Sequence, residues 1–382
     1  MPDDVFSTGA MMNVLAIEGY YGGSHRAFLD GWTACSGHAW TLLTLPPNKW
    51  KWRMRHGAIT FARQVERLAG EGGRWDVLFC SDMLNLAEFV GLVGESAQRL
   101  PRVVYFHENQ LTYPVRVESE RDYQYVMTNL TTCLAAEAVW FNSAFHRDEF
   151  LGAMGAFLKR MPDNRPLDAV DTIAARSEVH PPGIEAFAPR GPRRPGPLHI
   201  LWAARWEHDK NPEDFFAAMK ILKEKGIDFR LSVIGERFRD VPEVFAWAKG
   251  YFAQHIVRWG FQESRDAYRT ALCEADVVVS TANHEFFGIT IVEAIAAGAM
   301  PVLPKRLAYP EIISVLDPTS PQDHFYNGTI DDLAGRLADF SRKLAAGGAG
   351  EACGLLAERT MAQYGWAHLG PTMDSALTRQ IA

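Results

Sequence analysis

The sequence predicts an α/β protein built from two doubly wound, Rossmann-like domains that face a cleft. Three observations support this fold class. Short apolar runs alternate with helix-like segments, a pattern typical of parallel sheets covered by helices on both faces. The alternation stops at a stretch rich in Pro and Gly, residues 181–197, and then starts again. The length of 382 residues also suits two domains.

The first domain is expected to span residues 1–185. Its short apolar runs are predicted to be strands: Asn13–Glu18, His38–Leu45, Trp75–Cys80, Arg102–Phe106 and Ala138–Asn142. A helix is predicted at His25–Ala34, after the glycine-rich turn that follows the first strand. A strand, a glycine-rich turn and a helix in this order begin a doubly wound sheet.

The second domain is expected to span residues 195–365. Its predicted strands are Leu198–Ala203, Asp228–Ile234, His255–Trp259, Asp276–Ser280 and Met300–Pro304. Its predicted helices are Pro212–Lys225, Val241–Tyr251, Ser264–Glu274 and a helix that ends at Val292–Gly298. The tail, residues 330–344 and 351–381, is expected to be helical. Its last helix, residues 366–382, is expected to pack back on the first domain.

Composition excludes some classes of protein. The net charge of −7 argues against a protein that coats nucleic acid non-specifically, although it does not exclude a local basic patch. Five scattered cysteines without a CxxC pair are expected to be reduced thiols. The acidic, polar start of the chain does not resemble a signal peptide, and no apolar run approaches the length of a membrane span. We therefore expect a cytoplasmic protein.

The most informative segment is Glu285–Glu293, which reads EFFGITIVE. Two carboxylates stand eight positions apart around an expected helix start. A helix N-terminus offers backbone N–H groups and a positive dipole end, which suit a diphosphate. Carboxylates cannot bind phosphate, but they can accept hydrogen bonds from sugar hydroxyls beside it. The segment therefore predicts a nucleotide-sugar site.

Two further segments could bind the diphosphate. Gly22, Gly23 and Ser24 follow the first strand and open a helix, so the backbone could approach a phosphate closely. A structural turn is the alternative, since the GxGxxG and P-loop patterns do not occur. Arg205 and Lys210 follow the first strand of the second domain and could neutralise a diphosphate leaving group. The alternative there is a solvated loop.

Polar and basic segments in the first domain could bind an acceptor. His107, Glu108, Asn109 and Gln110 follow a buried strand, so they either point into the cleft or form a structural cluster. The segment 49–56, KWKWRMRH, interleaves cations with indoles, as surfaces that grip unpaired RNA do. Its pattern is closer to alternation than to helical spacing, and a solvated basic face is the alternative. Residues 121–125 and 159–166 are weaker candidates.

No metal-binding motif is recognisable. The sequence has no DxD between apolar runs and no Cys/His quartet at zinc spacing. We therefore expect no metal and no other cofactor.

Four motifs, in order over residues 13–305, resemble those of the retaining GT-B glycosyltransferases. The segment Glu285–Glu293 resembles their E-x7-E signature, with Phe286 where that group commonly has Gly or Pro. Gly23, His107 and the Arg205/Lys210 pair match the other three motifs. This resemblance implies the GT-B fold.

The first domain also resembles one family closely, the tRNA-queuosine mannosyltransferases. The matching strings are IEGYYGGSH (17–25), LPPNKWKWRMR (45–55), YFHENQLTYPV (105–115), ERDYQYV (120–126), FNSAFH (141–146) and PDNRP (162–166). The resemblance implies a GDP-mannose donor and queuosine in the anticodon loop of tRNA-Asp as the acceptor. It further implies transfer with retention of configuration, with the departing phosphate oxygen taking the acceptor proton.

The resemblance also implies roles for individual residues. The catalytic residues would be His107, Arg205, Lys210 and Glu285. The donor would be bound by Gly22, Gly23, Ser24, Phe287, Gly288, Ile289, Thr290 and Glu293. The acceptor tRNA would be bound by Lys49, Trp50, Lys51, Trp52, Arg53, Arg55, Glu108, Asn109, Gln110, Arg121, Tyr123 and Arg165.

Three other functions stay open from the residues. The same donor chemistry could serve a glycan, a lipid or a small-molecule acceptor. The two-domain fold also hosts nucleotide-sugar epimerases. A non-catalytic RNA-binding module is the third alternative, against which the full set of donor residues argues.

Overall fold

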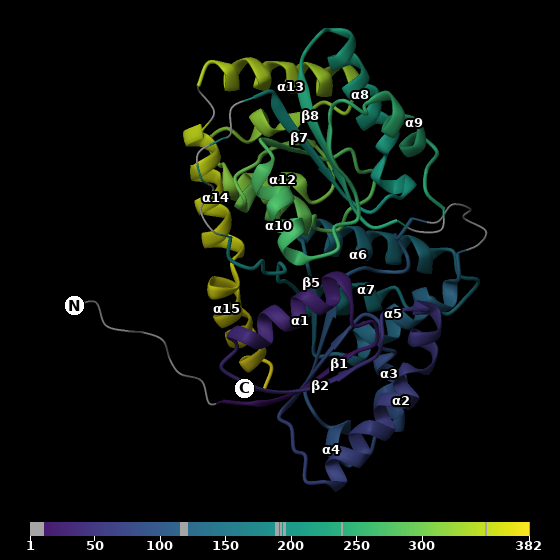
Figure 1. Cartoon of the computed structure of the whole chain (residues 1–382). Coiled ribbons are helices and arrows are strands. Elements are labelled where there is room, and N and C mark those ends of the chain that lie inside the picture. The colour runs from purple at the N-terminus through teal and green to yellow at the C-terminus, as the bar shows by residue number, and fades with distance from the viewer. Residues whose placement is uncertain are drawn as a thin grey trace. The chain divides into compact units, whose positions relative to one another are not determined.

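The computed structural model describes residues 11–114, 121–187, 191, 193, 196–237, 240–347 and 350–381 (Figure 1). The chain forms two compact units. The first combines Met1–Gly183 with Trp366–Ala382, and the second is Ile184–Gly365. Each unit has its own six-stranded sheet and its own apolar core.

The sheet of the first unit has the strand order β2-β1-β3-β4-β5-β6, and neighbouring strands pair in parallel. Its strands are β1 (Asn13–Glu18), β2 (Ala39–Thr44), β3 (Val77–Ser81), β4 (Arg102–Phe106), β5 (Ala138–Phe141) and β6 (Ser177–Val179). The carboxyl ends of parallel strands meet at one edge of a sheet. The residues that follow β1, β3 and β4 are therefore neighbours in space.

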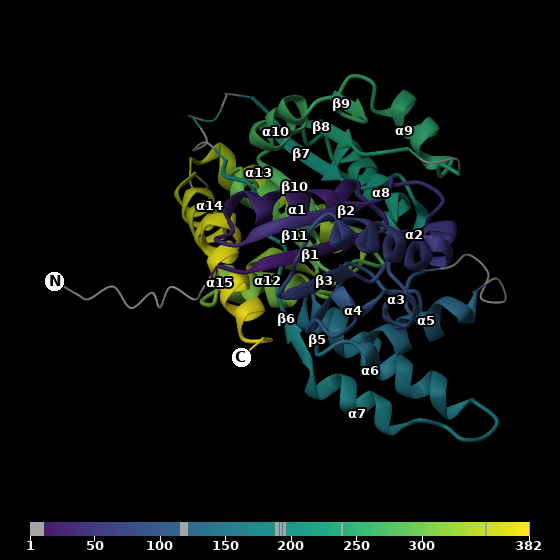
Figure 2. The ribbon, with the colours of Figure 1, turned by 90° about the horizontal axis from the view of Figure 1, so that it is seen from below.

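Helices connect these strands. They are α1 (Gly23–Cys35), α2 (Trp50–Gly70), α3 (Leu86–Leu92), α4 (Glu95–Gln98), α5 (Tyr123–Ala135), α6 (Ala144–Lys159) and α7 (Asp168–Ala175). α6 and α7 lie side by side (Figure 2). Phe61 and Val65 of α2, Phe89 of α3 and Phe150 of α6 are fully buried in one apolar cluster with the central strands. This cluster fixes the edge at which the polar residues gather.

The last helix, α15 (Trp366–Thr378), belongs to the first unit and lies beside α1 (Figure 1). The carboxylate of Asp374 accepts hydrogen bonds from Trp32 Nε1 at 2.8 Å, Ser36 Oγ at 2.8 Å and the Gly37 amide at 2.7 Å. The Trp366 ring meets Phe28 edge-on, with 5.8 Å between centroids. Helix α15 thus covers α1 and ties down its carboxyl end.

The sheet of the second unit has the strand order β12-β11-β10-β7-β8-β9, also with parallel pairing. Its strands are β7 (Leu198–Ala203), β8 (Phe229–Ile234), β9 (Ile256–Gly260), β10 (Val277–Val279), β11 (Met300–Pro304) and β12 (Phe325–Tyr326). Its helices are η2 (His208–Lys210), α8 (Pro212–Glu224), α9 (Val244–Tyr251), α10 (Arg265–Glu274), α11 (Ile289–Ala296), α12 (Tyr309–Leu316), η3 (Pro321–His324), α13 (Ile330–Ala345) and α14 (Gly350–Tyr364). Trp206 and Phe245 stack 4.0 Å apart in its core.

The expectation for the start of the second helix differs from the structure. The segment KWKWRMRH was expected to alternate, but α2 begins at Trp50 and continues for 21 residues. The helical period becomes visible only over this longer window, since the buried positions include Met54, Ala58 and Phe61. The tail after residue 350 is helical as expected, with α14 ending at Tyr364 and the separate last helix, α15, starting at Trp366.

Candidate functional site

Lys210 is the centre of a charge cluster in the second unit. Its side chain is 6% exposed, and its Nζ donates to the His284 carbonyl at 2.7 Å. The same Nζ lies 3.2 Å from Glu285 Oε2 and 3.1 Å from Asp209 Oδ2. A buried charge is tolerated only with such partners. Because two carboxylates face one ammonium, the cluster has an excess of negative charge.

The ring of His284 stays neutral beside this cluster. Burial, followed by the positive charge of Lys210, lowers the pKa of His284 to about 4. A neutral imidazole adds no second cation, so Lys210 is the positive group next to Glu285.

Gly288 sets the start of α11 directly after Glu285. It is the N-cap of the helix and has a φ of +97°, a left-handed conformation that favours glycine. A Cβ at this position would lie 2.9 Å from Tyr309 Cε1, and Tyr309 is held by a 2.7 Å hydrogen bond to Ser280. Without a side chain at the N-cap, the backbone N–H groups of the first turn form a site for an anion.

Glu293 lies on the second turn of α11 and has a different partner from Glu285. The Tyr268 hydroxyl donates to Glu293 Oε2 at 2.6 Å. Burial raises the pKa of Glu293, and burial together with the Glu293 charge raises the pKa of Tyr268 well above 10. The phenol therefore stays a donor. The two carboxylates of the motif thus flank the helix start, one beside a lysine and one beside a tyrosine.

Arg205 follows β7, where its guanidinium contacts Glu207 at 3.0 Å. Its side chain is 38% exposed, in contrast to the buried Lys210. Phe287 lies in the loop before α11, and Ile289 and Thr290 form the first turn of α11. These donor residues, predicted from the sequence, all belong to the second unit.

In the first unit, Gly22, Gly23 and Ser24 form the start of α1. Gly22 is the N-cap and Gly23, the first helical residue, has a φ of +51°. Gly23 and Ser24 are exposed. The turn therefore presents uncovered backbone at the N-terminus of a 13-residue helix.

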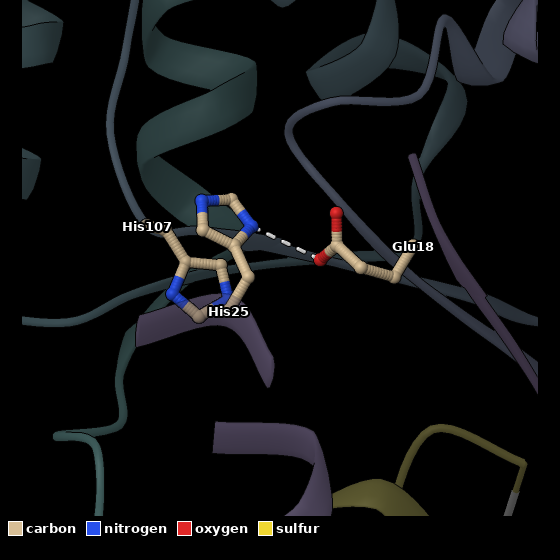
Figure 3. A group of neighbouring side chains, drawn as sticks. All are labelled: Glu18, His25 and His107. Atoms are coloured by element: carbon tan, nitrogen blue, oxygen red, sulfur yellow. Dashed lines mark hydrogen bonds and ion pairs between the residues drawn. The ribbon is translucent and has the colours of Figure 1, made fainter. Parts of the chain in front are cut away.

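His107, at the end of β4, stacks on a buried ion pair between Glu18 and His25 (Figure 3). His25 Nδ1 lies 3.0 Å from Glu18 Oε2, and the two side chains are 8% and 1% exposed. The rings of His25 and His107 have centroids 3.9 Å apart and planes inclined by 31°. Burial lowers the pKa of His25, but Glu18, with smaller contributions from Asp82 and Glu108, outweighs it and raises the value to about 9. The ring of His25 is therefore charged.

The backbone of His107 is held from both neighbouring strands. Asp82, which follows β3, accepts the His107 N–H through Oδ1 at 2.9 Å. Asn142, which follows β5, donates from Nδ2 to the His107 carbonyl at 2.9 Å. Burial raises the pKa of Asp82 to about 8, although the positive His25 opposes this rise. Oδ2 of Asp82 is buried and has no hydrogen-bond partner among the residues that the structure describes.

Glu18, His25 and His107 together have the composition of a metal site, since their ligand atoms lie within 4.8 Å of one another. The geometry fits an ion pair better. Metal ions bind histidine nitrogens in the plane of the ring at ~2.0–2.1 Å. His25 Nδ1 instead lies at hydrogen-bond distance, 3.0 Å, from Glu18 Oε2. Because the pKa of His25 is about 9, its Nδ1 carries a proton that it donates to Glu18, and a protonated nitrogen has no lone pair for a metal ion.

The polar residues after His107 are mostly engaged within the first unit. Asn109 is fully buried, and its Oδ1 accepts the amides of Leu111 and Thr112. Gln110 donates from Nε2 to Glu108 at 3.1 Å, and its carbonyl accepts from Arg121. Asn109 is therefore placed to stabilise the turn. Of these residues, Glu108 is the partly exposed one beside His107.

The predicted RNA-binding segments meet at the start of α2 and the start of α5. Trp50 packs on Tyr125 with centroids 5.1 Å apart, and the Tyr125 hydroxyl donates to the Lys51 carbonyl. Arg55 lies over the Tyr125 ring at 4.6 Å and also pairs with Asp122. Two segments 70 residues apart in sequence thus form one basic and aromatic surface.

The end of α6 extends this surface. Tyr123, the first residue of α5, stacks on Phe157 with centroids 5.3 Å apart, and Arg160 lies 6.0 Å from the Tyr123 ring. The indole of Trp52 is 59% exposed. We call the set Trp50, Lys51, Trp52, Arg55, Tyr123, Tyr125 and Arg160 the basic–aromatic platform.

Three other predicted residues have local roles. Lys49 precedes α2 with a φ of +53°. Arg53 donates to the Pro46 carbonyl and to Asn48, which holds the turn before α2. Arg165 donates to the Met161 carbonyl in the loop after α6.

Sequence reasoning did not select several residues at the site. Glu18 ends an apolar strand and Asp82 directly follows one, a signal that could have identified them because the carboxyl ends of parallel strands share one edge. His25 and Arg160 lay within matched or nominated segments without being chosen. Asn142 also lay in a matched segment and at the end of a predicted strand, whereas no pattern in the sequence pointed to Asp209 or Tyr268.

Comparisons with known proteins show which families the sequence matches. Residues 13–184 match the family described as tRNA-queuosine alpha-mannosyltransferase N-terminal, and residues 184–342 match glycosyl transferases group 1. The chain is 36% identical to the tRNA-queuosine alpha-mannosyltransferase of Drosophila melanogaster over 345 residues, which cover 87% of this chain and 88% of the relative. It is 27% identical to the GDP-mannose:cellobiosyl-diphosphopolyprenol alpha-mannosyltransferase of Xanthomonas oryzae, over 31% of this chain and 32% of the relative.

The fold resembles solved glycosyltransferases of the GT-B class. The sucrose-phosphate synthase of Thermosynechococcus elongatus superposes with a TM-score of 0.67 at 15% identity, covering 96% of this chain and 98% of that one. The predicted class, two doubly wound α/β domains of GT-B type, is thereby confirmed. Within the described residues, no helix is both long and apolar enough to cross a membrane.

Proposed function

Because the chain belongs to the tRNA-queuosine alpha-mannosyltransferase family, we propose that it transfers mannose from GDP-mannose to queuosine in the anticodon loop of tRNA-Asp, with retention of configuration. The observation that carries the chemistry is the Lys210–Glu285 pair at the glycine-capped start of α11. A buried cation and a helix N-terminus suit the diphosphate of a nucleotide sugar, and the carboxylate beside them suits the hydroxyls of its sugar.

The donor would use these groups separately. The diphosphate would be bound by Lys210, Arg205 and the N-terminus of α11, which meet the negative charge that develops as the C1–O bond breaks. Glu285 would accept hydrogen bonds from hydroxyls of the mannosyl group. Glu293, with the Tyr268 hydroxyl beside it, would bind the ribose hydroxyls.

In the first unit, the start of α1 would contribute backbone N–H groups to the diphosphate, and His107 would face the sugar. Because the sugar becomes positively charged in an oxocarbenium-like transition state, a neutral His107 is required. The departing phosphate oxygen would take the acceptor proton, so no glycosidase-type pair of carboxylates is needed.

The tRNA would bind to the basic–aromatic platform. Its cations can neutralise phosphates, and its exposed rings can stack on bases of the anticodon loop. Trp52 supplies the most exposed ring, and Tyr123 is the second. Glu108, Gln110 and Arg121 would lie nearer the reacting nucleoside, since they follow His107 or bind its loop.

We further propose that transfer needs no metal ion and takes place in the cytoplasm. Lys210 and Arg205 provide the positive charge that a divalent cation supplies in other enzymes that use nucleotide sugars. Activity that is unchanged by EDTA would agree with this. Activity restored only by Mg²⁺ or Mn²⁺ after dialysis would contradict it.

The test incubates the protein with GDP-mannose and tRNA that carries queuosine, followed by nucleoside mass spectrometry. The expected product is queuosine heavier by one hexose, in tRNA-Asp but not in the other queuosine tRNAs. Matched tRNA with guanosine at the same position is the control and should stay unmodified. GDP release without hexosylated queuosine would overturn the acceptor assignment, and an epimerised sugar nucleotide without acceptor would identify an epimerase.

A further inference from the structure

We propose that the buried Glu18–His25 ion pair is a positioning device that keeps His107 uncharged and fixed in one orientation toward the donor sugar. This inference rests on the proposed function, in which His107 faces the reacting sugar. It assigns to Glu18 and His25, which come from β1 and α1, an indirect part in the reaction.

The ion pair is held in place because both carboxylate oxygens of Glu18 have a defined partner. Glu18 ends β1, and its Oε1 accepts the Tyr20 amide at 2.7 Å while its Oε2 faces His25 Nδ1 at 3.0 Å. Tyr20 also meets the His25 ring edge-on, with 5.9 Å between centroids. His25 therefore has one available orientation, and the ring stacked on it inherits that constraint.

Three rings and two side chains then define the position of His107. Phe28 and Tyr105 meet the His107 ring edge-on, at 5.1 and 4.7 Å between centroids, while His25 covers one of its faces. Asp82 and Asn142 hold its backbone N–H and C=O. A side chain that needed only burial would not require a charged ring on one face.

The charges around His107 decide its protonation. The facing groups are Glu18 of β1, His25 of α1, Asp82 after β3, Glu108 in the loop of His107 and His146 of α6. Burial, followed by the positive His25 and then by His146, lowers the pKa of His107 well below its usual value. The carboxylate of Glu18 keeps His25 positive, so it acts on His107 through His25.

This arrangement matters for the transition state. A protonated His107 beside an oxocarbenium-like sugar would place two positive charges together, which raises the barrier. With His25 charged below a pKa of about 9, His107 stays neutral throughout the physiological range. The ion pair therefore keeps kcat from falling at mildly acidic pH.

Glu18→Gln is the sharpest test because it keeps the stacked rings and removes only the carboxylate. The pKa of His25 then falls, so its positive charge weakens, and the pKa of His107 rises toward its ordinary value while burial still opposes the rise. We expect the acidic limb of the kcat–pH profile to move to higher pH, with kcat up to about fourfold below wild type near pH 6, the loss for a pKa that reaches the ordinary value, and within about twofold at pH 8. The KM for GDP-mannose should change by less than about twofold.

A second variant and a spectroscopic readout separate positioning from folding. His25→Gln should shift the same limb and also lower kcat at pH 8 by about threefold, since the stack is lost. NMR of labelled histidine should show the His107 titration moving to higher pH in both variants. His368→Gln, at an exposed position on α15, is the control, and its kcat–pH profile and His107 titration should match those of the wild type.

The outcomes are distinct from those that test the function. If wild-type protein forms no hexosylated queuosine, the proposed function fails, whereas the NMR titration still reports on the ion pair. If wild type is active and both folded variants keep its pH profile and its His107 titration, the ion pair is only structural and the inference is overturned.

Discussion

Lys210 and His25 are both buried cations, but their surroundings are balanced differently. Lys210 faces Glu285 and Asp209, so one charge meets two. His25 forms an ion pair with one carboxylate, Glu18, and its ring stacks on the neutral ring of His107. A site with excess negative charge repels a diphosphate unless Lys210 is present, whereas a balanced pair can persist without ligand. These differences lead to different predictions.

Replacing Lys210 by Ala should lower kcat by about a hundredfold or more, because the group that meets the leaving diphosphate is removed. Glu285→Ala should have a comparable effect through the loss of sugar contacts. Steady-state kinetics with GDP-mannose and queuosine tRNA, on variants checked by circular dichroism, provide the measurement.

Lys220→Ala is the matched control for Lys210. Lys220 is on α8 of the same unit, is half exposed and pairs with Glu224 at 3.7 Å. It should retain wild-type kinetics. Wild-type turnover by Lys210→Ala would remove this residue from the donor site.

Stability of the first unit should decrease as the pH rises from about 6.5 to 9. In the folded state, the pKa of His25 is raised to about 9 from an ordinary 6.5, and that of Asp82 is raised to about 8 from 3.8. The folded state therefore binds more protons than the unfolded state across this window. Stability decreases with pH under that condition, by at most about 1.4 kcal/mol per pH unit for each group.

Urea unfolding at a series of pH values measures this slope. Glu18→Gln should flatten it, because His25 loses the partner that raises its pKa. A wild-type unfolding midpoint that stays constant from pH 6.5 to 9 would show that these protons are not retained in the folded state.

At the scale of elements, the start of α2 combines two kinds of tryptophan. Trp50 packs with Tyr125 and with the apolar pair Met54 and Met83, whereas Trp52 is 59% exposed. The two tryptophans are separated by one lysine in a basic segment, so the sequence alone does not show which of them is exposed. Helical geometry turns them to different faces.

Trp52→Ala should raise the KM for tRNA by about tenfold, since base stacking on an aromatic side chain contributes ~1–3 kcal/mol. The KM for GDP-mannose and the melting temperature should stay close to wild type. Trp50→Ala should instead lower stability by about 1–3 kcal/mol, because it opens a cavity beside Tyr125.

The matched control is Trp247→Ala, which removes a 44% exposed indole from α9 in the second unit. It should change neither KM. An unaltered KM for tRNA in Trp52→Ala would remove α2 from the RNA surface.

Arg160 tests whether the end of α6 belongs to the same surface. Arg160→Ala should weaken tRNA binding and reduce the slope of log affinity against log salt by about 0.7–0.9, the value for one phosphate contact. Fluorescence anisotropy at several salt concentrations measures this slope. Lys343→Ala, exposed on α13 of the second unit, should leave it unchanged.

Elements with simple local patterns could be predicted from the sequence. β1, β4, β7 and β11 have the predicted bounds, because each is a short apolar run that ends at a turn or polar segment. Helix α2 was missed because seven residues at its start alternate, and helical period needs a longer window. The short strands β6 and β12 are two or three residues long and carry too little pattern to be recognised.

The candidate site could be predicted only in part. Lys210 and Glu285 were found because motifs in a single segment contain them. Their contact, across 75 positions, depends on how β7 and β10 lie together in the sheet. The stack of His25 on His107 likewise depends on strand order, which β1, β3 and β4 acquire only on folding.

At the scale of the whole molecule, the chain leaves the first unit at residue 183 and re-enters it at residue 366. Asp374 is the main polar link at this return, with three donors from the end of α1. The first unit is thus formed by two segments of chain that are far apart in sequence.

Asp374→Ala should destabilise the first unit by about 2–4 kcal/mol, because three donors lose a charged acceptor and one of them is the buried Trp32 indole. Asp374→Asn keeps one acceptor oxygen and should lose less. Hydrogen exchange followed by mass spectrometry should show faster exchange in α1 and β2, with the second unit unchanged. Equal effects on both units would contradict this division.

The return of α15 to the first unit also has a consequence for biosynthesis. A ribosome makes residues 184–365 before α15, which takes roughly ten to forty seconds at ~5–20 residues per second. During this interval α1 lacks its cover, and the indole of Trp32 has no access to Asp374. The nascent first unit therefore presents an apolar face to chaperones until the rest of the polypeptide has been translated.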